Sequence, residues 1–354
     1  MTFSSARTCK DQHPDLAMIK SISLAPMNEI VSTFEPFVPR RWLRGGHSQT
    51  IASFFMRREN QLPPAEKRFY QVSEDTQLVC ECHWQADKTG AMTLIIVHGL
   101  EGSSESSYIL GTAAKALAAG MNVVRMNMRN CGGTEKLTPT LYHSGFSGDL
   151  SAVVSHLIRE DHVSRIALVG FSMGGNLVLN LVGKWGAAAP TEVRASATVS
   201  PVMDLAPSAD ALHNRSNRVY EIKFVRGLSR LYRRKAVLFP GRYDLNRLEG
   251  IRSIREFDEN ITAPYSGFLD ADDYYARVSS SRLATQIALP SLIIYSTDDP
   301  FIRLLPETRA RLRGNNFVNY IETERGGHCA YLAEPNGYDG RWAERTVVEF
   351  LRQF

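Results

Sequence analysis

Residues 165–175 read Arg-Ile-Ala-Leu-Val-Gly-Phe-Ser-Met-Gly-Gly, and this stretch decides the fold. Its first half, Arg165 to Val169, is short, apolar and partly β-branched, which is typical of a strand covered on both faces. The next five residues (170–174) follow a Gly-x-Ser-x-Gly pattern and open an expected helix. The two glycines leave room for a tight turn that exposes the hydroxyl of Ser172. The stretch therefore predicts a strand, a sharp elbow with a candidate nucleophile, and a helix.

Further strands and helices alternate on both sides of this elbow. Apolar runs predict strands near residues 93–97, 121–126, 195–199, 291–295 and 317–322. Helical patterns lie near residues 108–119, 148–160, 176–182, 306–313 and 339–353. Two earlier segments, 68–72 and 77–84, alternate like antiparallel edge strands. This order predicts an α/β fold with a mostly parallel sheet of about eight strands, flanked by helices.

The alternation of strands and helices stops between residues 201 and 282. Twelve basic and three acidic residues fall within 213–255, whereas 256–273 holds six acidic residues and no basic one. We therefore expect a helical cap or lid at 201–282, inserted into a single core made of residues 31–200 and 283–354. Residues 1–30 show little pattern, and we expect them to be poorly ordered.

The composition is that of an ordinary globular protein, with 44% hydrophobic and 22% charged residues. Lys and Arg number 41 against 37 Asp and Glu, a net charge of +4 that does not argue for nucleic acid. We expect no signal peptide, because no apolar segment of that kind is visible near residue 1, and the sequence has no apolar run long enough to span a membrane, no CxxC pair, no HExxH and no GxGxxG. We expect a cytoplasmic protein without metal, cofactor, nucleic acid or integral membrane segment. Peripheral membrane contact and the oligomeric state stay open.

A serine hydroxyl becomes a nucleophile when a base removes its proton and an acid orients that base. After a serine on a strand–elbow–helix turn, the acid and then the histidine follow along the chain. His328, on a glycine-rich loop, is the histidine that follows both Ser172 and the expected cap. Asp298 and Asp299 end the strand at 291–295, and we favour Asp299 because Pro-Phe-Ile follows it. Asp298 is then a turn residue, and Asp204 is a weaker alternative that more simply caps a turn or helix.

Residues 98–102, His-Gly-Leu-Glu-Gly, follow the expected strand at 93–97. A loop at this place supplies one backbone N–H to an oxyanion hole, and the residue after the nucleophile supplies another. We assign these donors to Leu100 and Met173. His98 is expected to be structural, with its ring bonded to loop backbone.

Several segments together resemble the α/β-hydrolases and, within them, the YheT-like group (the AB hydrolase 4 family). The resemblance covers residues 37–354 and rests on the elbow and on six further segments. These are residues 39–50, 98–102, 127–133, 142–145, 255–258 and 298–301. Asn130 departs from the glycine usual in that group, but asparagine tolerates left-handed backbone, so we expect an intact loop.

The resemblance implies that Ser172, Asp299 and His328 form the family's triad. It also implies hydrolysis of carboxylic esters with short or medium acyl chains, with acyl transfer in some relatives. Our first hypothesis is therefore a serine carboxylesterase of lipid metabolism that acts on a small-molecule ester through an acyl-enzyme. The alternatives are an acyltransferase that moves an acyl group from acyl-CoA to an alcohol, and a non-catalytic binding protein on the same scaffold.

Two sets of polar residues have weaker functional interpretations. The basic stretch is expected to form a solvated face or to pair with the acidic segment 256–273, although it also suits an anionic lipid surface or acyl-CoA phosphates. It consists of Arg226, Arg230, Arg233, Arg234 and Lys235. His47, His143 and Arg129 are candidates for the pocket wall, with turn and packing roles favoured.

Overall fold

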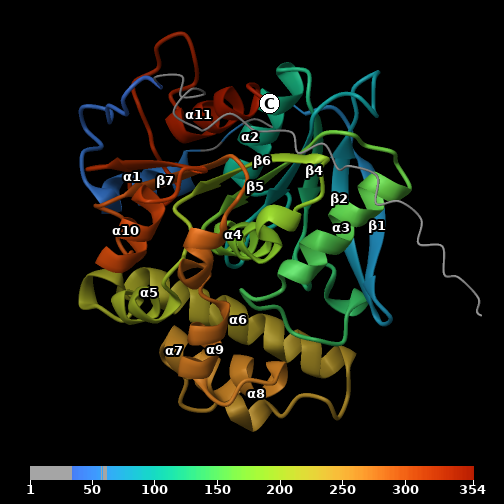
Figure 1. The fold of residues 1–354 in the computed structure, drawn as a ribbon. Helices are drawn as coiled ribbons and strands as arrows, with labels where there is room; N and C mark the ends of the chain where they lie inside the picture. Colours follow the sequence, from blue (N-terminus) through green and yellow to red (C-terminus); the bar gives the residue numbers. More distant parts are fainter. Residues whose placement is uncertain (1–33, 57, 59–61) are drawn as a thin grey trace, which may run out of the picture.

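The computed structural model describes residues 34–56, 58 and 62–354, and the segment 1–30 lies outside them. Eight strands form one sheet in the order β1-β2-β4-β3-β5-β6-β7-β8 (Figure 1). Their bounds are β1 Glu66–Ser73, β2 Thr76–His83, β3 Thr93–Val97, β4 Asn122–Met126, β5 Ile166–Phe171, β6 Val193–Val199, β7 Ser291–Ser296 and β8 Val318–Thr323. The pairs β1–β2 and β2–β4 are antiparallel, and all other pairs are parallel. The predicted α/β fold with about eight strands is confirmed.

Helices cover both faces of the sheet (Figure 1). The core helices are α2 Ser107–Ala118, α3 Ser147–Arg159, α4 Met173–Trp185, α10 Pro306–Arg313 and α11 Trp342–Leu351. In the central strand β3, Leu94 and Ile96 face the apolar cluster that includes α2 and α11. Ile95 and Val97 face the cluster that includes α3 and α4. Because alternate side chains of a strand point to opposite faces, an uninterrupted apolar run supplies both halves of the core.

A layer of helices lies between β6 and β7 in sequence and beside one end of the sheet in space (Figure 1, gold and orange). It comprises α5 Leu205–Leu212, α6 Arg218–Leu238, α7 Ile254–Phe257, α8 Ala263–Ser266 and α9 Ala271–Val278. We call residues 205–278 the cap. Its two ends meet, because the Leu205 N–H donates to Ser279 Oγ at 3.1 Å and the Ser281 N–H donates to the Met203 carbonyl at 3.3 Å.

Two residues of the basic stretch of α6 bind the core and not the acidic segment 256–273, whereas Arg226, Arg230 and Arg233 are exposed. The ammonium of the buried Lys235 donates to the carbonyl oxygens of Glu135 and Thr138. Burial lowers the pKa of Lys235 to about 8. Arg234 forms an ion pair with the Glu135 carboxylate at 2.6 Å. The expected pairing with the acidic segment is therefore wrong for these two residues, because the core loop at Glu135 lies closer.

The acidic segment 256–273 has other partners. Asp272 pairs with Arg255, and Asp273 pairs with Arg277 one helical turn further along α9. Two of the six acidic residues of this segment thus have cationic partners within the cap itself.

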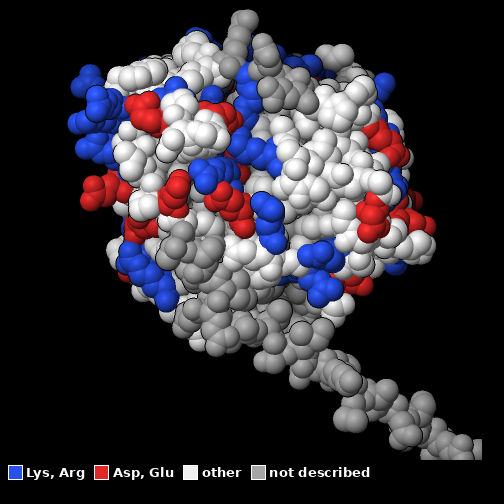
Figure 2. Space-filling model, turned by 90° about the horizontal axis from the view of Figure 1, so that it is seen from above, with Lys and Arg blue, Asp and Glu red and all other residues white. Residues whose placement is uncertain are grey.

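The face of the molecule opposite the cap carries charges of both signs. In Figure 2 the basic and acidic side chains on this face lie interspersed. Such mixing agrees with the near balance of charges in the sequence.

We expect Lys235→Met to lower the free energy of unfolding by about 1–3 kcal/mol, because two carbonyl oxygens lose a buried donor. Arg233→Met is the matched control: it removes an exposed cation that forms no ion pair among the described residues. The control should change stability by less than about 0.5 kcal/mol. Urea unfolding of the three proteins checks this, and equal losses for both variants would contradict the anchoring role.

Candidate active site

Ser172 occupies the sharp turn between β5 and α4. Its backbone is left-handed, with φ 53° and ψ −117°. A Cβ on Gly170 would lie 2.4 Å from the Gly174 carbonyl oxygen, and a Cβ on Gly174 would lie 2.4 Å from the Val97 carbonyl oxygen. Larger residues at these two positions cannot fit without moving the backbone. The spacing of the glycines is therefore a steric requirement of the elbow.

Met173 and Leu100 present backbone N–H groups beside this serine. Met173 is the first residue of α4, so its N–H has no partner within the helix and lies at the positive end of the helix dipole. The loop of Leu100 packs against the elbow, because a Cβ on Gly99 would lie 3.1 Å from Ser172 Cβ.

Two tyrosines, the partly buried Tyr108 and the buried Tyr142, hold the loop of Leu100 in place. The Gly99 N–H donates to the Tyr108 hydroxyl at 3.0 Å, and the Glu101 N–H donates to the Tyr142 hydroxyl at 3.2 Å. The N–H groups on either side of Leu100 are thus occupied, which leaves the Leu100 N–H as the donor in this loop for a ligand.

His328 and Asp299 are in direct contact. His328 Nδ1 lies 2.8 Å from Asp299 Oδ2. The other carboxylate oxygen, Oδ1, accepts the N–H groups of Phe301 at 3.1 Å and Ile302 at 2.9 Å. The carboxylate is therefore fixed by backbone donors and orients the imidazole.

The histidine loop and the elbow converge on one backbone carbonyl at the end of β6. The Val199 oxygen accepts the Ser172 N–H at 3.0 Å and lies 3.6 Å from Cys329 Sγ. The elbow after β5 and the loop of His328 after β8 thus meet at the end of β6, and Asp299 reaches the same loop from the end of β7.

The contact between Ser172 Oγ and His328 Nε2 is not formed in this geometry. Nε2 instead lies 3.8 Å from Cys329 Sγ. Catalytic hydrogen bonds are often long before substrate binds, so the geometry shows the pairing of Asp299 with His328 and leaves that of His328 with Ser172 as a prediction. The sequence analysis gave Cys329 no role at the site, although its position directly after His328 indicates that it lies close to the imidazole.

The two other acidic candidates have structural roles. Asp298 Oδ1 accepts the Gly327 N–H at 2.8 Å and the Ser296 hydroxyl, so Asp298 shapes the histidine loop. Asp204 accepts the Leu305 N–H at 2.9 Å and the Thr308 hydroxyl at 3.1 Å at the start of α10.

His98 and Asn130 support the surrounding loops. His98 Nδ1 lies 2.8 Å from the Gly99 carbonyl oxygen, and Nε2 accepts the Met128 N–H at 3.2 Å. Burial lowers the pKa of His98 to about 4, so its ring is neutral. Asn130 is left-handed with φ 65°, as the sequence predicts.

Of the three candidates for the pocket wall, His143 lines the cavity at Ser172, whereas Arg129 and His47 do not. Arg129 forms a buried bidentate pair with Asp149 at 2.6 and 2.7 Å, which is a structural role. His143 lines the cavity at Ser172, and burial lowers its pKa to about 3. His47 Nδ1 lies 3.1 Å from the Tyr220 hydroxyl of α6, outside that cavity.

A narrow, mostly apolar cavity of about 110 Å³ runs from Ser172 between the core and the cap. Its apolar wall includes Leu100, Met173, Val202, Leu205, Leu212, Phe224, Leu228, Ile254, Phe257, Phe301 and Ile302. The cap supplies many of these side chains, so its packing decides the shape of the cavity. Such a lining is suited to an acyl chain or another apolar group.

A buried carboxyl group interrupts the apolar wall of this cavity. Asp258 Oδ2 accepts the Tyr275 hydroxyl at 2.7 Å, and both residues line the cavity. Burial raises the pKa of Asp258 to about 6. Asp258 begins a π-helical turn, Asp258–Thr262, a conformation often found at functional sites. Sequence reasoning missed this pair, because the two residues lie in different helices of the cap.

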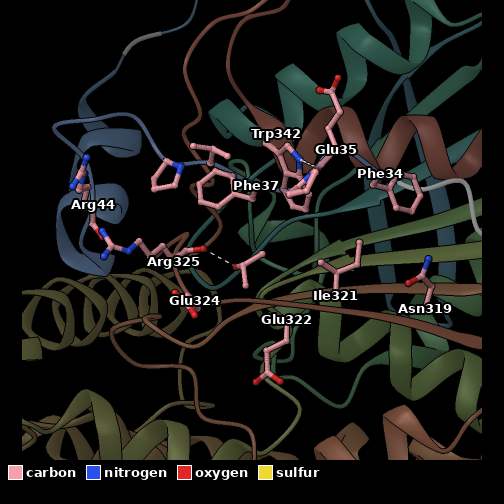
Figure 3. A pocket seen from close by; sticks show the side chains of 14 residues that line it. Phe34, Glu35, Phe37, Arg44, Asn319, Ile321, Glu322, Glu324, Arg325 and Trp342 are labelled. Carbon is pink, nitrogen blue, oxygen red and sulfur yellow. Dashed lines mark hydrogen bonds between the residues drawn. The ribbon is translucent and has the colours of Figure 1, made fainter.

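A second cavity, of about 680 Å³, lies beside the edge strand β8 (Figure 3). Phe34, Phe37 and Trp342 flank it on one side and Ile321 on the other, with Arg44 and Arg325 at one end. It contains none of the candidate catalytic residues and is separate from the site at Ser172.

Among the described residues, no group of three His, Cys, Asp or Glu side chains is placed to hold a metal ion. Of the helices that the structure describes, none is both long enough and apolar enough to cross a membrane.

Charges around His328 raise its pKa. Burial alone lowers the pKa of the imidazole, but Cys329 and Asp299 outweigh it and raise the pKa above the ordinary value. The Asp299 carboxylate, 2.8 Å from Nδ1, favours the imidazolium. The neutral imidazole, the form that accepts a proton, therefore becomes dominant only on the alkaline side of the usual histidine range.

We expect NMR titration to place the His328 pKa above the ordinary value of about 6.5. Asp299→Asn should lower this pKa, because it removes the negative charge that favours the imidazolium. Glu324→Gln, an exposed carboxylate on the neighbouring loop, is the control and should leave the pKa unchanged. An unchanged pKa in Asp299→Asn would contradict the electrostatic pairing.

Comparisons with known proteins agree with this fold. The family model described as the alpha/beta hydrolase fold matches residues 93–335. YheT of Escherichia coli (strain K12), which is named provisionally as an esterase, is 31% identical over 94% of this chain and 97% of its own. Phospholipase ABHD3 of Mus musculus is 28% identical over 90% of this chain and 78% of its own. Monoacylglycerol lipase of Saccharomyces cerevisiae (strain ATCC 204508 / S288c) is 27% identical over 74% of this chain and 59% of its own.

Solved structures share the fold at low sequence identity. The Pyrococcus furiosus esterase Pf2001 aligns with a TM-score of 0.53 and 17% identity, covering 90% of this chain and 98% of that one. The 2,6-dihydroxy-pseudo-oxynicotine hydrolase aligns with a TM-score of 0.55 and 16% identity, covering 82% of this chain and 68% of that one. The chain belongs to the α/β-hydrolase family and, within it, to the YheT-like group.

Proposed function

We propose that this carboxylic ester hydrolase works through an acyl-enzyme on Ser172, with His328 as base and Asp299 as the residue that orients it. The observation that carries the proposal is the 2.8 Å contact between Asp299 and His328, beside a serine held in a left-handed elbow. The combination of a nucleophile, an oriented base and free N–H donors is what acyl transfer requires.

The first half-reaction forms the acyl-enzyme. Neutral His328 takes the proton of the Ser172 hydroxyl through Nε2 as the oxygen attacks the ester carbonyl carbon. The carbonyl oxygen becomes an oxyanion, and the N–H groups of Leu100 and Met173 stabilise it. Asp299 stabilises the imidazolium, which then protonates the departing alcohol.

The second half-reaction releases the acid. Water enters where the alcohol left, His328 takes one of its protons, and the resulting hydroxide attacks the acyl carbon. A second oxyanion forms on the same two N–H groups. His328 then returns its proton to Ser172, and the free enzyme is restored.

The cavity between core and cap supports an apolar acyl chain of short to medium length as the substrate group. Relatives are named as a phospholipase and a monoacylglycerol lipase, which act on lipid esters. We therefore place the substrate among small, lipid-like carboxylic esters.

Acyl transfer to an alcohol uses the same residues and differs only in the nucleophile of the second half-reaction. One relative, from Saccharomyces cerevisiae (strain ATCC 204508 / S288c), is named medium-chain fatty acid ethyl ester synthase/esterase 2 and is 27% identical over 74% of this chain and 62% of its own. Acyl transfer stays a prediction, which product analysis with ethanol and an acyl-CoA donor distinguishes from hydrolysis.

We expect Ser172→Ala to lower kcat/KM for a p-nitrophenyl ester by at least about 10⁴-fold, because the nucleophile is lost. A fluorophosphonate should add once to the wild type, as read by intact mass, and not to the variant. Ser155→Ala on α3 is the matched control and should keep both properties. A folded wild type that gains no adduct would favour the non-catalytic binding protein, and an active Ser172→Ala would refute the assignment.

We expect Leu228→Trp to shorten the acyl group that the enzyme accepts, because the larger ring fills the cavity from α6. The value of kcat/KM for the octanoyl ester should fall at least about tenfold, while that for the acetyl ester changes by less than about threefold. Val237→Trp, at an exposed position of the same helix, is the control. Equal losses for both esters would mean that this cavity does not hold the acyl chain.

A further inference from the structure

Helix α1, Gly46–Phe55, turns its apolar side outward. Ile51, Phe54 and Phe55 are 46%, 65% and 72% exposed, and their spacing places them on one face of the helix. Buried Gln49, by contrast, points inward: its side chain donates to the Leu43 carbonyl at 2.7 Å and accepts the Leu332 N–H at 2.7 Å. This is the reverse of an ordinary surface helix, in which the apolar side faces the core.

The cap continues this apolar surface. Val219 of α6 is 78% exposed, and the Lys223 ammonium, one turn further along, lies 3.9 Å from the centre of the Phe54 ring. We call Ile51, Phe54, Phe55 and Val219 the outer face. A group of large apolar side chains exposed across two elements marks a surface that meets another apolar phase.

The exposed charges on the two helices that carry the outer face are positive. Helix α1 has no charged residue. On α6 the exposed charged residues are all basic, and its one acidic residue, Glu221, is buried. On α6, the exposed basic residues that form no ion pair with a described residue are Arg218, Lys223, Arg226, Arg230 and Arg233. An apolar face flanked by cations is the pattern of a helix that lies in an anionic lipid interface.

The outer face adjoins the candidate catalytic histidine. The Thr50 hydroxyl of α1 accepts the His328 N–H at 2.9 Å. On the cap side, Tyr220 stacks on His47 with centroids 5.7 Å apart and contacts Phe301 at 5.3 Å. Phe301 in turn contacts the His328 ring at 4.4 Å and lines the cavity at Ser172.

We propose that the outer face docks this protein on the surface of an anionic lipid bilayer, with α1 lying at the interface and the basic residues of α6 meeting lipid headgroups. A second copy of the chain is a poorer occupant, because two copies placed face to face would bring their basic α6 helices together. Docking itself is independent of the chemistry. Its consequence, delivery of lipid esters to the cavity, rests on the proposed function.

Vesicle sedimentation tests the apolar part of this surface. The wild type should sediment with phosphatidylcholine vesicles that contain about 30 mol% phosphatidylglycerol, and much less with phosphatidylcholine alone. The double variant Phe54→Ser/Phe55→Ser should lower the partition coefficient at least about tenfold. Phe69→Ser on β1 and Leu269→Ser in the cap remove exposed apolar side chains elsewhere and should bind as the wild type does.

A charge variant tests the basic part. Arg226→Gln/Arg230→Gln should weaken binding to the anionic vesicles by about fivefold per charge and leave binding to neutral vesicles unchanged. Circular dichroism confirms that each variant is folded. No binding by the wild type, or equal binding by wild type and Phe54→Ser/Phe55→Ser, would overturn the proposal. So would light scattering that shows a dimer lost in that variant, since the face would then join two copies.

Activity measurements separate docking from chemistry. The Phe54→Ser/Phe55→Ser variant should hydrolyse dissolved p-nitrophenyl acetate at the wild-type rate and esters embedded in anionic vesicles at least about tenfold more slowly. Vesicle binding without hydrolysis of any ester would refute the proposed function and leave docking standing. Hydrolysis without vesicle binding would refute docking and leave the proposed function standing.

Discussion

The close approach of Gly174 to the end of β3 is the constraint on which the rest of the site depends. An added Cβ on Gly174 would lie 2.4 and 2.5 Å from the carbonyl oxygens of Val97 and His98. Helix α4 can therefore start directly at the end of β5 and point its first N–H groups past β3. This contact sets where Ser172 stands, and it keeps the loop that follows β3 against the serine.

The opposite wall of the site depends on a second set of contacts, made by backbone groups more than by charged side chains. Asp299 is held by two N–H groups, Gly327 is held by Asp298, and His328 is held by Thr50 of α1. Three segments that are distant in sequence thus support one imidazole. Removing any one of them leaves a polar group without its partner in a partly buried loop, so the arrangement is expected to be lost or kept as a unit.

Local patterns were sufficient to predict the sheet, the elbow and the contact between Asp299 and His328, because each depends on short-range order and on a chain order common to the fold. Helix α4 begins at Met173, three residues earlier than the periodicity predicts, since the elbow passes into the helix without a separate cap. What the sequence could not predict depends on tertiary packing. The Lys235 ammonium donates to a core carbonyl one hundred residues away, and the Tyr275 hydroxyl donates to Asp258 across the cap. The apolar side of α1 faces outward. None of these three features is indicated by a pattern in the neighbouring sequence.

The two ends of the cap are joined by hydrogen bonds, Leu205 to Ser279 and Ser281 to Met203. The chain therefore leaves the core and returns to it at adjacent points, so the cap is an insertion between β6 and β7. A change in the cap that keeps the contacts of Lys235 and Tyr220 with the core alters the cavity wall and leaves in place the strand ends that precede Ser172, Asp299 and His328. In evolution this separates two properties that usually constrain each other: the reacting groups can stay the same while the choice of substrate drifts, and exchange of the whole cap between relatives is a single-step route to a new specificity.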